Sequence, residues 1–179
     1  AVTRGPDIGT SASFLAMGQA NQKPYDGSVF VGYMDGGTLL DYASNMFEID
    51  MKSITPADGI LVAADFNYDG CTDAFVSGRT VFDRNEQTSA LLAGDCSGSL
   101  KIASVGLPAF YEGAAVVGDF GRDGRLEYFA SGSVDTNSAE IFYYRFKSDG
   151  VPENVSFSSL PPLVGLRYSV ICTGASSGG

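Results

Sequence analysis

The chain has 179 residues, and its 21 Asp and Glu against 11 Lys and Arg give a formal net charge of −10. Such an acidic chain repels nucleic acid and anionic membranes, so we expect neither as a partner. The absence of His excludes a Ser–His triad, a Cys–His dyad and a His-ligated metal site. The apolar runs are too short to cross a bilayer, and because the chain starts at Ala1 without a charged and apolar leader, we expect that any signal peptide has already been removed.

The composition favours strands joined by many turns. Aromatic residues, all Phe and Tyr, make up 12% of the chain and are common in strands. The 23 Gly are too frequent for a helical protein. We therefore expect a single all-β domain over residues 1–179.

In chain order, the first strands are predicted at 12–18, 29–33 and 46–50. An apolar strand, an acidic loop and a second strand then follow within residues 59–78, which predicts a hairpin with a long turn. Further strands are predicted at 89–94 and 100–105.

The hairpin recurs 54 residues later, over 113–132. The pattern Asp-Phe-x-x-Asp-Gly, which begins at Asp65, begins again at Asp119, and both copies continue without a gap to a Ser-Gly pair. Strands at 139–146 and 155–160 complete the second copy. Four strands in about 54 residues, repeated, are typical of a β-propeller blade.

The chain therefore predicts about three four-stranded propeller-type blades, over 10–57, 58–111 and 112–164, with a strand and a flexible tail in 165–179. Residues 165–171 resemble the first strand of a blade, so we expect one blade to be split between the two ends. Propellers usually have about four to eight blades. We therefore expect either an open array, an assembly of several chains or part of a longer polypeptide.

The first acidic loop, residues 65–73, has the oxygen-rich spacing of a calcium site. Calcium takes about six to eight hard oxygen ligands, and Gly70 at position 6 permits a sharp turn. An EF-hand is excluded, because position 12 is Val76 and both flanks are predicted strands. The candidate ligands are Asp65, Asn67, Asp69 and Asp73 at positions 1, 3, 5 and 9, with the main-chain carbonyl of Cys71.

The second acidic loop, residues 119–127, is a weaker version of the first. Asp119, Asp123 and Glu127 keep positions 1, 5 and 9, but position 3 is Gly121, which has no side-chain ligand. The neighbouring residues Arg122 and Arg125 offer an alternative source of positive charge. For both loops the other interpretation is a metal-free Asx-type turn.

Residues 64–73 and 118–124 resemble FG-GAP/VCBS-type repeats, the calcium-binding blades of integrin α-subunit propellers and of many bacterial surface proteins. The Leu-Pro stretches at 107–108 and 160–161 resemble the segment that often precedes the next blade in bacterial versions. The resemblance implies an extracellular blade with a structural Ca²⁺, used in adhesion, carbohydrate binding or assembly.

Two further features remain open. A Cys71–Cys96 disulfide is one interpretation of the three Cys, and buried single thiols are the other. Asn154 begins an N-glycosylation sequon, which carries meaning only where the source glycosylates such sites.

The sequence thus favours a calcium-stabilised structural or adhesive repeat protein that self-associates through blade edges into an oligomer or filament. The alternative is a lectin-like module that binds glycans or cell-surface proteins. A polysaccharide lyase or hydrolase is the least favoured class, because no nucleophile motif, P-loop or dinucleotide fingerprint is present. We therefore predict no catalytic residues.

Overall fold

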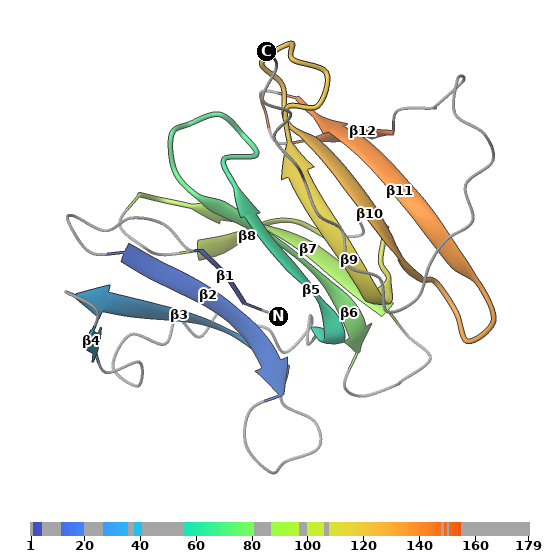
Figure 1. Ribbon diagram of the computed structural model, residues 1–179, viewed down its shortest axis with the longest axis horizontal. Helices are drawn as coiled ribbons and strands as arrows, with labels where there is room; N and C mark the ends of the chain where they lie inside the picture. Colours follow the sequence, from blue (N-terminus) through green and yellow to red (C-terminus); the bar gives the residue numbers. More distant parts are fainter. Residues whose placement is uncertain are drawn as a thin grey trace, which may run out of the picture.

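The computed structural model describes residues 2–4, 12–19, 27–35, 38–40, 56–80, 87–96, 100–105, 108–147, 149 and 151–154. Over these ranges the chain is all-β, as predicted, and forms three four-stranded antiparallel sheets (Figure 1). Within the same ranges no helix is long and apolar enough to cross a membrane. Each sheet takes its four strands in chain order.

The first sheet contains β1 (Val2–Arg4), β2 (Ala12–Gln19), β3 (Gly27–Asp35) and β4 (Thr38–Leu40). The expectation of a split blade is corrected here, because the place beside β2 is taken by the N-terminal strand β1. Likewise, the strand beside β3 is β4 and comes earlier than the fourth strand predicted at 46–50. Residues 46–50 and 165–171 lie outside the described residues.

The second sheet contains β5 (Pro56–Ala64), β6 (Asp73–Thr80), β7 (Gln87–Gly94) and β8 (Leu100–Val105). The predicted range of β8 is confirmed, and β7 begins two residues earlier than expected. β5 begins at Pro56 and continues across a register shift between Ala57 and Ile60.

The third sheet contains β9 (Tyr111–Gly118), β10 (Glu127–Ser133), β11 (Ala139–Phe146) and β12 (Pro152–Asn154). The predicted range of β11 is confirmed. The fourth strand precedes the predicted range 155–160, which lies outside the described residues. β12 pairs with the last three residues of β11 and is therefore short.

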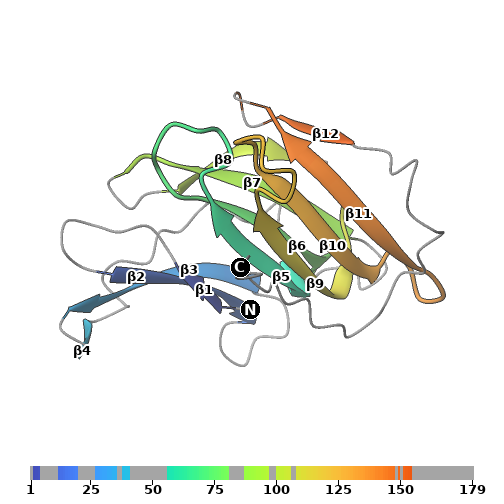
Figure 2. The same cartoon turned by 45° about the horizontal axis from the view of Figure 1, so that its top comes forward.

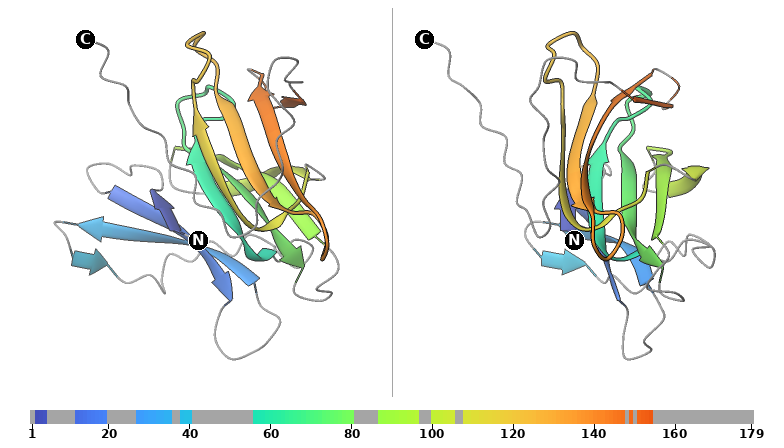
Figure 3. Two further views of the ribbon diagram at one scale, coloured as in Figure 1. Left: turned by 45° about the vertical axis from the view of Figure 1, so that its right-hand side comes forward. Right: turned by 90° about the vertical axis from the view of Figure 1, so that its right-hand side faces the viewer.

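The second and third sheets pack face to face on an aromatic core (Figures 2 and 3). Phe75 meets Tyr128 at 4.9 Å between ring centroids, and Phe110 stacks on Phe142 at 5.0 Å. Burying such rings contributes roughly 1.5 to 3 kcal/mol each. At one side of this contact β5 lies beside β9 and also contacts β2 of the first sheet.

A glycine near the start of β5 and of β9 allows a close approach to the neighbouring strand. A Cβ at Gly59 would lie 1.7 Å from the carbonyl oxygen of Ser77, and one at Gly113 would lie 2.2 Å from that of Ser131. The pairing shifts register at both places. The repeated Gly at the start of each hairpin is therefore required by main-chain packing.

Candidate functional site: two acidic loops

The first acidic loop connects β5 to β6 and is held by the carboxylate of its first residue. Asp65 Oδ1 accepts a hydrogen bond from the amide of Asp69 at 3.0 Å, and Asp65 Oδ2 accepts one from Gly70 at 2.9 Å. Asp69 Oδ1 in turn accepts one from the amide of Cys71 at 2.7 Å. Gly70 has a φ of 87°, a left-handed conformation that glycine adopts without strain.

Asp73 is buried beneath the loop, with 1% of its surface exposed. Its Oδ2 accepts hydrogen bonds from the amides of Phe66 at 2.9 Å and Asn67 at 3.3 Å, and its Oδ1 accepts one from Gly94 at 2.8 Å. Burial raises the pKa of Asp73 above its usual value, although the three amide hydrogen bonds act in the opposite direction. Both carboxylate oxygens thus accept hydrogen bonds from main-chain amides, and these bonds attach the loop to β7.

The remaining predicted ligand, Asn67, faces Asp69. Its Oδ1 accepts a hydrogen bond from the Asp69 amide at 3.0 Å, and its Nδ2 donates one to Asp69 Oδ2 at 2.9 Å. Among the described residues, no three or more Cys, Asp or Glu side chains are gathered closely enough to hold a metal ion. The calcium site therefore stays a prediction, although the hard oxygens of Asp65, Asn67 and Asp69 are of the type that calcium prefers.

A disulfide joins Cys71 of the first acidic loop to Cys96 in the turn after β7, with the two Cα atoms 4.8 Å apart. Together with the Asp73–Gly94 hydrogen bond, it attaches the loop to the second sheet at two points. Cys71 and Cys96 are therefore not buried single thiols, which was the other interpretation of the sequence. Cys172 lies outside the described residues.

The second acidic loop repeats the main-chain geometry of the first. Asp119 Oδ1 accepts a hydrogen bond from the amide of Asp123 at 3.0 Å, and Asp119 Oδ2 accepts one from Gly124 at 2.9 Å. These bonds correspond to those that Asp65 makes in the first loop. Gly124 has a φ of 81°, close to that of its counterpart. The sequence repeat is therefore also a repeat of hydrogen bonds.

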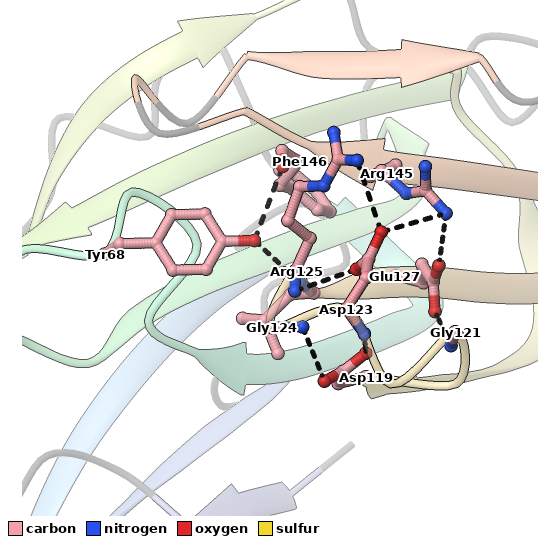
Figure 4. Close-up of polar contacts among 10 residues, drawn as sticks. Tyr68, Asp119, Gly121, Asp123, Gly124, Arg125, Glu127, Arg145 and Phe146 are labelled. Atoms are coloured by element: carbon pink, nitrogen blue, oxygen red, sulfur yellow. Dashed lines mark hydrogen bonds and ion pairs between the residues drawn. The ribbon is translucent and has the colours of Figure 1, made fainter.

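The second loop differs from the first in its charge balance, and Figure 4 shows the contacts of its acidic residues with Arg125 and Arg145. Glu127 is fully buried and accepts a hydrogen bond from Arg145 Nη2 at 2.8 Å and another from the Gly121 amide at 2.8 Å. Asp123 lies 3.2 Å from Arg125 Nη2 and 3.7 Å from Arg145 Nη2. Burial alone would raise the pKa of Glu127, but its hydrogen bonds, above all that from Arg145, hold the pKa below its usual value.

The glycine at position 3 of the second loop has a steric cause. A Cβ at Gly121 would lie 2.9 Å from Glu127 Oε1, so a ligand-bearing side chain would displace the buried carboxylate. At position 3 the second loop therefore has no oxygen ligand, and its main chain lies close to the ion pair between Glu127 and Arg145. Arg125 pairs with Asp123 as the sequence suggested, whereas Arg122 forms no ion pair with the acidic residues that the structure describes.

Arg145 is the functional residue that sequence reasoning missed. It lies on β11 directly opposite Glu127, and its position follows only from the pairing of β10 with β11. In the second sheet Leu92 pairs with Ala74, which places Ala93 beside Asp73. Within the described residues, no Lys or Arg forms an ion pair with Asp65, Asp69 or Asp73. The first loop thus has three carboxylates without a basic partner there.

Tyr68 of the first loop extends to the third sheet (Figure 4). Its hydroxyl accepts a hydrogen bond from the Leu126 amide at 2.6 Å and donates one to the carbonyl of Phe146 at 3.4 Å. The residue has a φ of 61°, which is strained for a side chain of this size. The first loop therefore also holds two successive sheets together.

We expect Tyr68→Phe to lower the free energy of unfolding by about 0.5 to 1.5 kcal/mol, because it removes both hydrogen bonds but keeps the ring. Urea denaturation of parent and variant measures the difference. Tyr128→Phe is the control for loss of a tyrosine hydroxyl, because the Tyr128 hydroxyl has no hydrogen-bond partner among the described residues. An unchanged midpoint for Tyr68→Phe would show that the inter-sheet contact contributes nothing to stability.

The predicted glycosylation residue, Asn154, ends β12 and pairs with Tyr144. The other two residues of its sequon lie outside the described residues, so glycosylation stays a prediction. No family model, curated protein or solved structure matches this chain.

Proposed function

We propose that this chain is an extracellular structural or adhesive repeat protein, built of propeller-type blades, stabilised by calcium at its first acidic loop and able to self-associate. The observation that carries the proposal is the contrast between the two loops. They share their main-chain hydrogen bonds, but among the described residues only the second loop has basic partners, Arg125 and Arg145. The first is left with acidic and amide oxygens to which a divalent ion is suited.

The sheet arrangement supports the blade assignment. Each sheet is a four-stranded meander that follows the previous one in the chain, and β5 and β9, the first strands of their sheets, lie side by side. Propeller blades have the same strand order and bring their first strands together around an axis. The resemblance of residues 64–73 and 118–124 to FG-GAP/VCBS-type repeats points in the same direction.

In the first loop, Asp65, Asn67 and Asp69 and the carbonyl of Cys71 would hold the ion. We assign Asp73 mainly to supporting the loop from below, because its two oxygens accept three amide hydrogen bonds. Bound calcium would offset the repulsion between the carboxylates and fix the loop that carries Tyr68. Its role in this proposal is therefore structural, and no catalytic step is assigned to it.

The disulfide supports an extracellular location. Disulfides persist in oxidising compartments and are rare in the cytosol. Cys71 and Cys96 form such a bond at the base of the first loop. A net charge of −10 is also compatible with a soluble, exposed protein that avoids nucleic acid.

Calcium is expected to raise the stability of the protein. An ion present at about 100 times its dissociation constant adds about 2.7 kcal/mol, which for a chain of this length corresponds to roughly 5 to 10 °C in the unfolding midpoint. Thermal unfolding with calcium and with excess chelator measures this shift. Light scattering under the same two conditions measures the mass and tests self-association.

The two loops provide a matched pair of variants for this experiment. Asp65→Asn should abolish most of the calcium-dependent shift, whereas Asp119→Asn should leave it unchanged, because the second loop is neutralised by Arg125 and Arg145. If the thermal unfolding midpoint of the parent protein is the same with calcium and with chelator, the calcium assignment is overturned. A parent that is monomeric at every concentration would overturn the assembling role.

A further inference from the structure

The contact between the second and third sheets defines a docking face. In the second sheet, Val62, Phe75 and Leu91 form one cross-strand row, because Phe75 pairs with Val62 on one side and with Leu91 on the other. Phe75 and Leu91 are buried, and all three residues belong to the core shared with the third sheet. We call this side of a sheet, which faces the next sheet along the chain, its outgoing face.

The third sheet has the same row on its own outgoing face. Phe129 pairs with Val116 on one side and with Tyr143 on the other. Because side chains alternate along a strand, these three lie on the side opposite to Tyr128 and Ala130, which pack against the second sheet. Phe129 and Tyr143 are partly exposed, whereas Phe75 and Leu91 in the corresponding row are buried, and Val116 is partly exposed as Val62 is.

The phenylalanines of the two acidic loops show the difference most clearly. Phe66 is fully buried, because its ring packs against Phe146 of the next sheet at 4.5 Å between centroids. Its counterpart Phe120 is 45% exposed and lies over Gly118 of its own sheet. The sequence thus repeats an inter-sheet contact residue at a place where the described part of the chain has no further sheet for it to contact.

The edges of the sheets are less suited to association than the outgoing face of the third sheet. The edge strands β4 and β12 have three residues each. The longer edge strand β8 has an exposed Lys101, and charged side chains of this kind discourage strand addition. The face of the third sheet is therefore the better candidate for association.

We propose that the outgoing face of the third sheet binds the first sheet of a second copy of this chain, head to tail, in the manner in which the third sheet covers the second. This rests on the self-association proposed above and places it on a sheet face and not on the edges. The partner follows from continuity with the existing interface, because the side of a repeat that faces the previous sheet already fits an outgoing face within the chain. A head-to-tail contact generates a ring or a filament.

The external contact should be weaker than the internal one. Ser133 stands where the second sheet has Arg79, which pairs with Glu112 and lies over the Tyr111 ring within the chain. Arg122 likewise replaces Tyr68. We therefore expect association that depends on concentration.

The test is sedimentation velocity of the 179-residue protein over a concentration series with calcium, for the parent, Phe120→Ser and Val116→Thr. Both changes reduce the apolar surface of the face, and Val116→Thr nearly preserves shape. We expect each to weaken association at least about tenfold, with Phe120→Ser the stronger. Val151→Ser, which alters another exposed apolar side chain at the β11–β12 turn, should associate as the parent does.

Ile102→Ser on β8 distinguishes the face from the edge. If it disrupts association and Phe120→Ser and Val116→Thr do not, the sheet-edge route holds and the present inference is overturned, while the assembling role survives. A parent protein that remains monomeric overturns both the present inference and the assembling role. Circular dichroism and the thermal midpoint establish that each variant is folded, so that a lower mass in sedimentation can be attributed to loss of the interface.

Discussion

Replacing Arg145 with methionine is expected to lower the free energy of unfolding by about 1 to 3 kcal/mol at neutral pH, because a buried carboxylate loses its charged hydrogen-bond donor. Glu127 is completely buried, and Arg145 donates a hydrogen bond to it at 2.8 Å. Removing the guanidinium would leave a carboxylate in the protein interior with the amide of Gly121 but without a cation. Methionine preserves much of the length and apolar volume of the arginine stem, so the loss reports the charge.

The pH dependence identifies the buried carboxylate as the cause. In the parent, the pKa of Glu127 lies below its usual value of 4.5, so its ionised form stabilises the fold above that pH, and this contribution is lost as the pH falls through the folded pKa. In the variant, burial is opposed only by the hydrogen bonds from Tyr143 and from the amides of Gly121 and Phe120, so we expect the pKa of Glu127 to rise relative to the parent. The ionised form of Glu127 then stabilises the fold less than it does in the parent, and the loss is greatest where the group is fully ionised.

The difference in unfolding free energy between parent and Arg145→Met should therefore be largest near pH 7 and shrink toward pH 4. Urea denaturation across this range measures it. The control is the double variant Arg145→Met with Glu127→Gln, which removes the buried charge and should recover at least about 1 kcal/mol at pH 7. A cost that is independent of pH and not relieved by Glu127→Gln would mean that Arg145 acts through packing alone.

The strands of the second and third sheets could be predicted because apolar runs and a 54-residue repeat fix them. The range of β11 and that of β8 were both correct. The three-residue strands β1, β4 and β12 were missed, because such short segments have no periodicity of their own and are strands only through their partners. That is why the expected split blade is replaced by pairing of β1 with β2.

The acidic loops could be located from sequence, but the direction of their side chains could not. Spacing placed Asp73 at a ligand position, whereas it accepts amide hydrogen bonds from the loop and from Gly94 on β7. The partner of Glu127 lies 18 residues away on the facing strand, and only the strand register reveals it. The acidic residues of a loop lie close together in the sequence, whereas the residue that neutralises one of them can lie on a neighbouring strand of the sheet.

Removing the disulfide is expected to lower the free energy of unfolding by roughly 3 kcal/mol. Cys71 and Cys96 are 25 residues apart in sequence, and a cross-link over a loop of this length restricts the unfolded chain by about that amount. Urea denaturation of the double variant Cys71→Ser with Cys96→Ser measures the loss. Denaturation of the parent in the presence of a reducing agent is the control, because it opens the same bond without changing a residue.

The same variant tests whether the disulfide also prepares the first loop for calcium. Cys71 follows Asp69 and Gly70 directly, so without the cross-link the loop must be ordered when the ion binds. We expect calcium affinity, measured by calorimetry, to fall by about tenfold, while Asp73 continues to attach the loop to β7. If stability falls but affinity does not, the hydrogen bonds of Asp65 and Asp73 are sufficient to shape the loop, and the disulfide acts only on the unfolded chain.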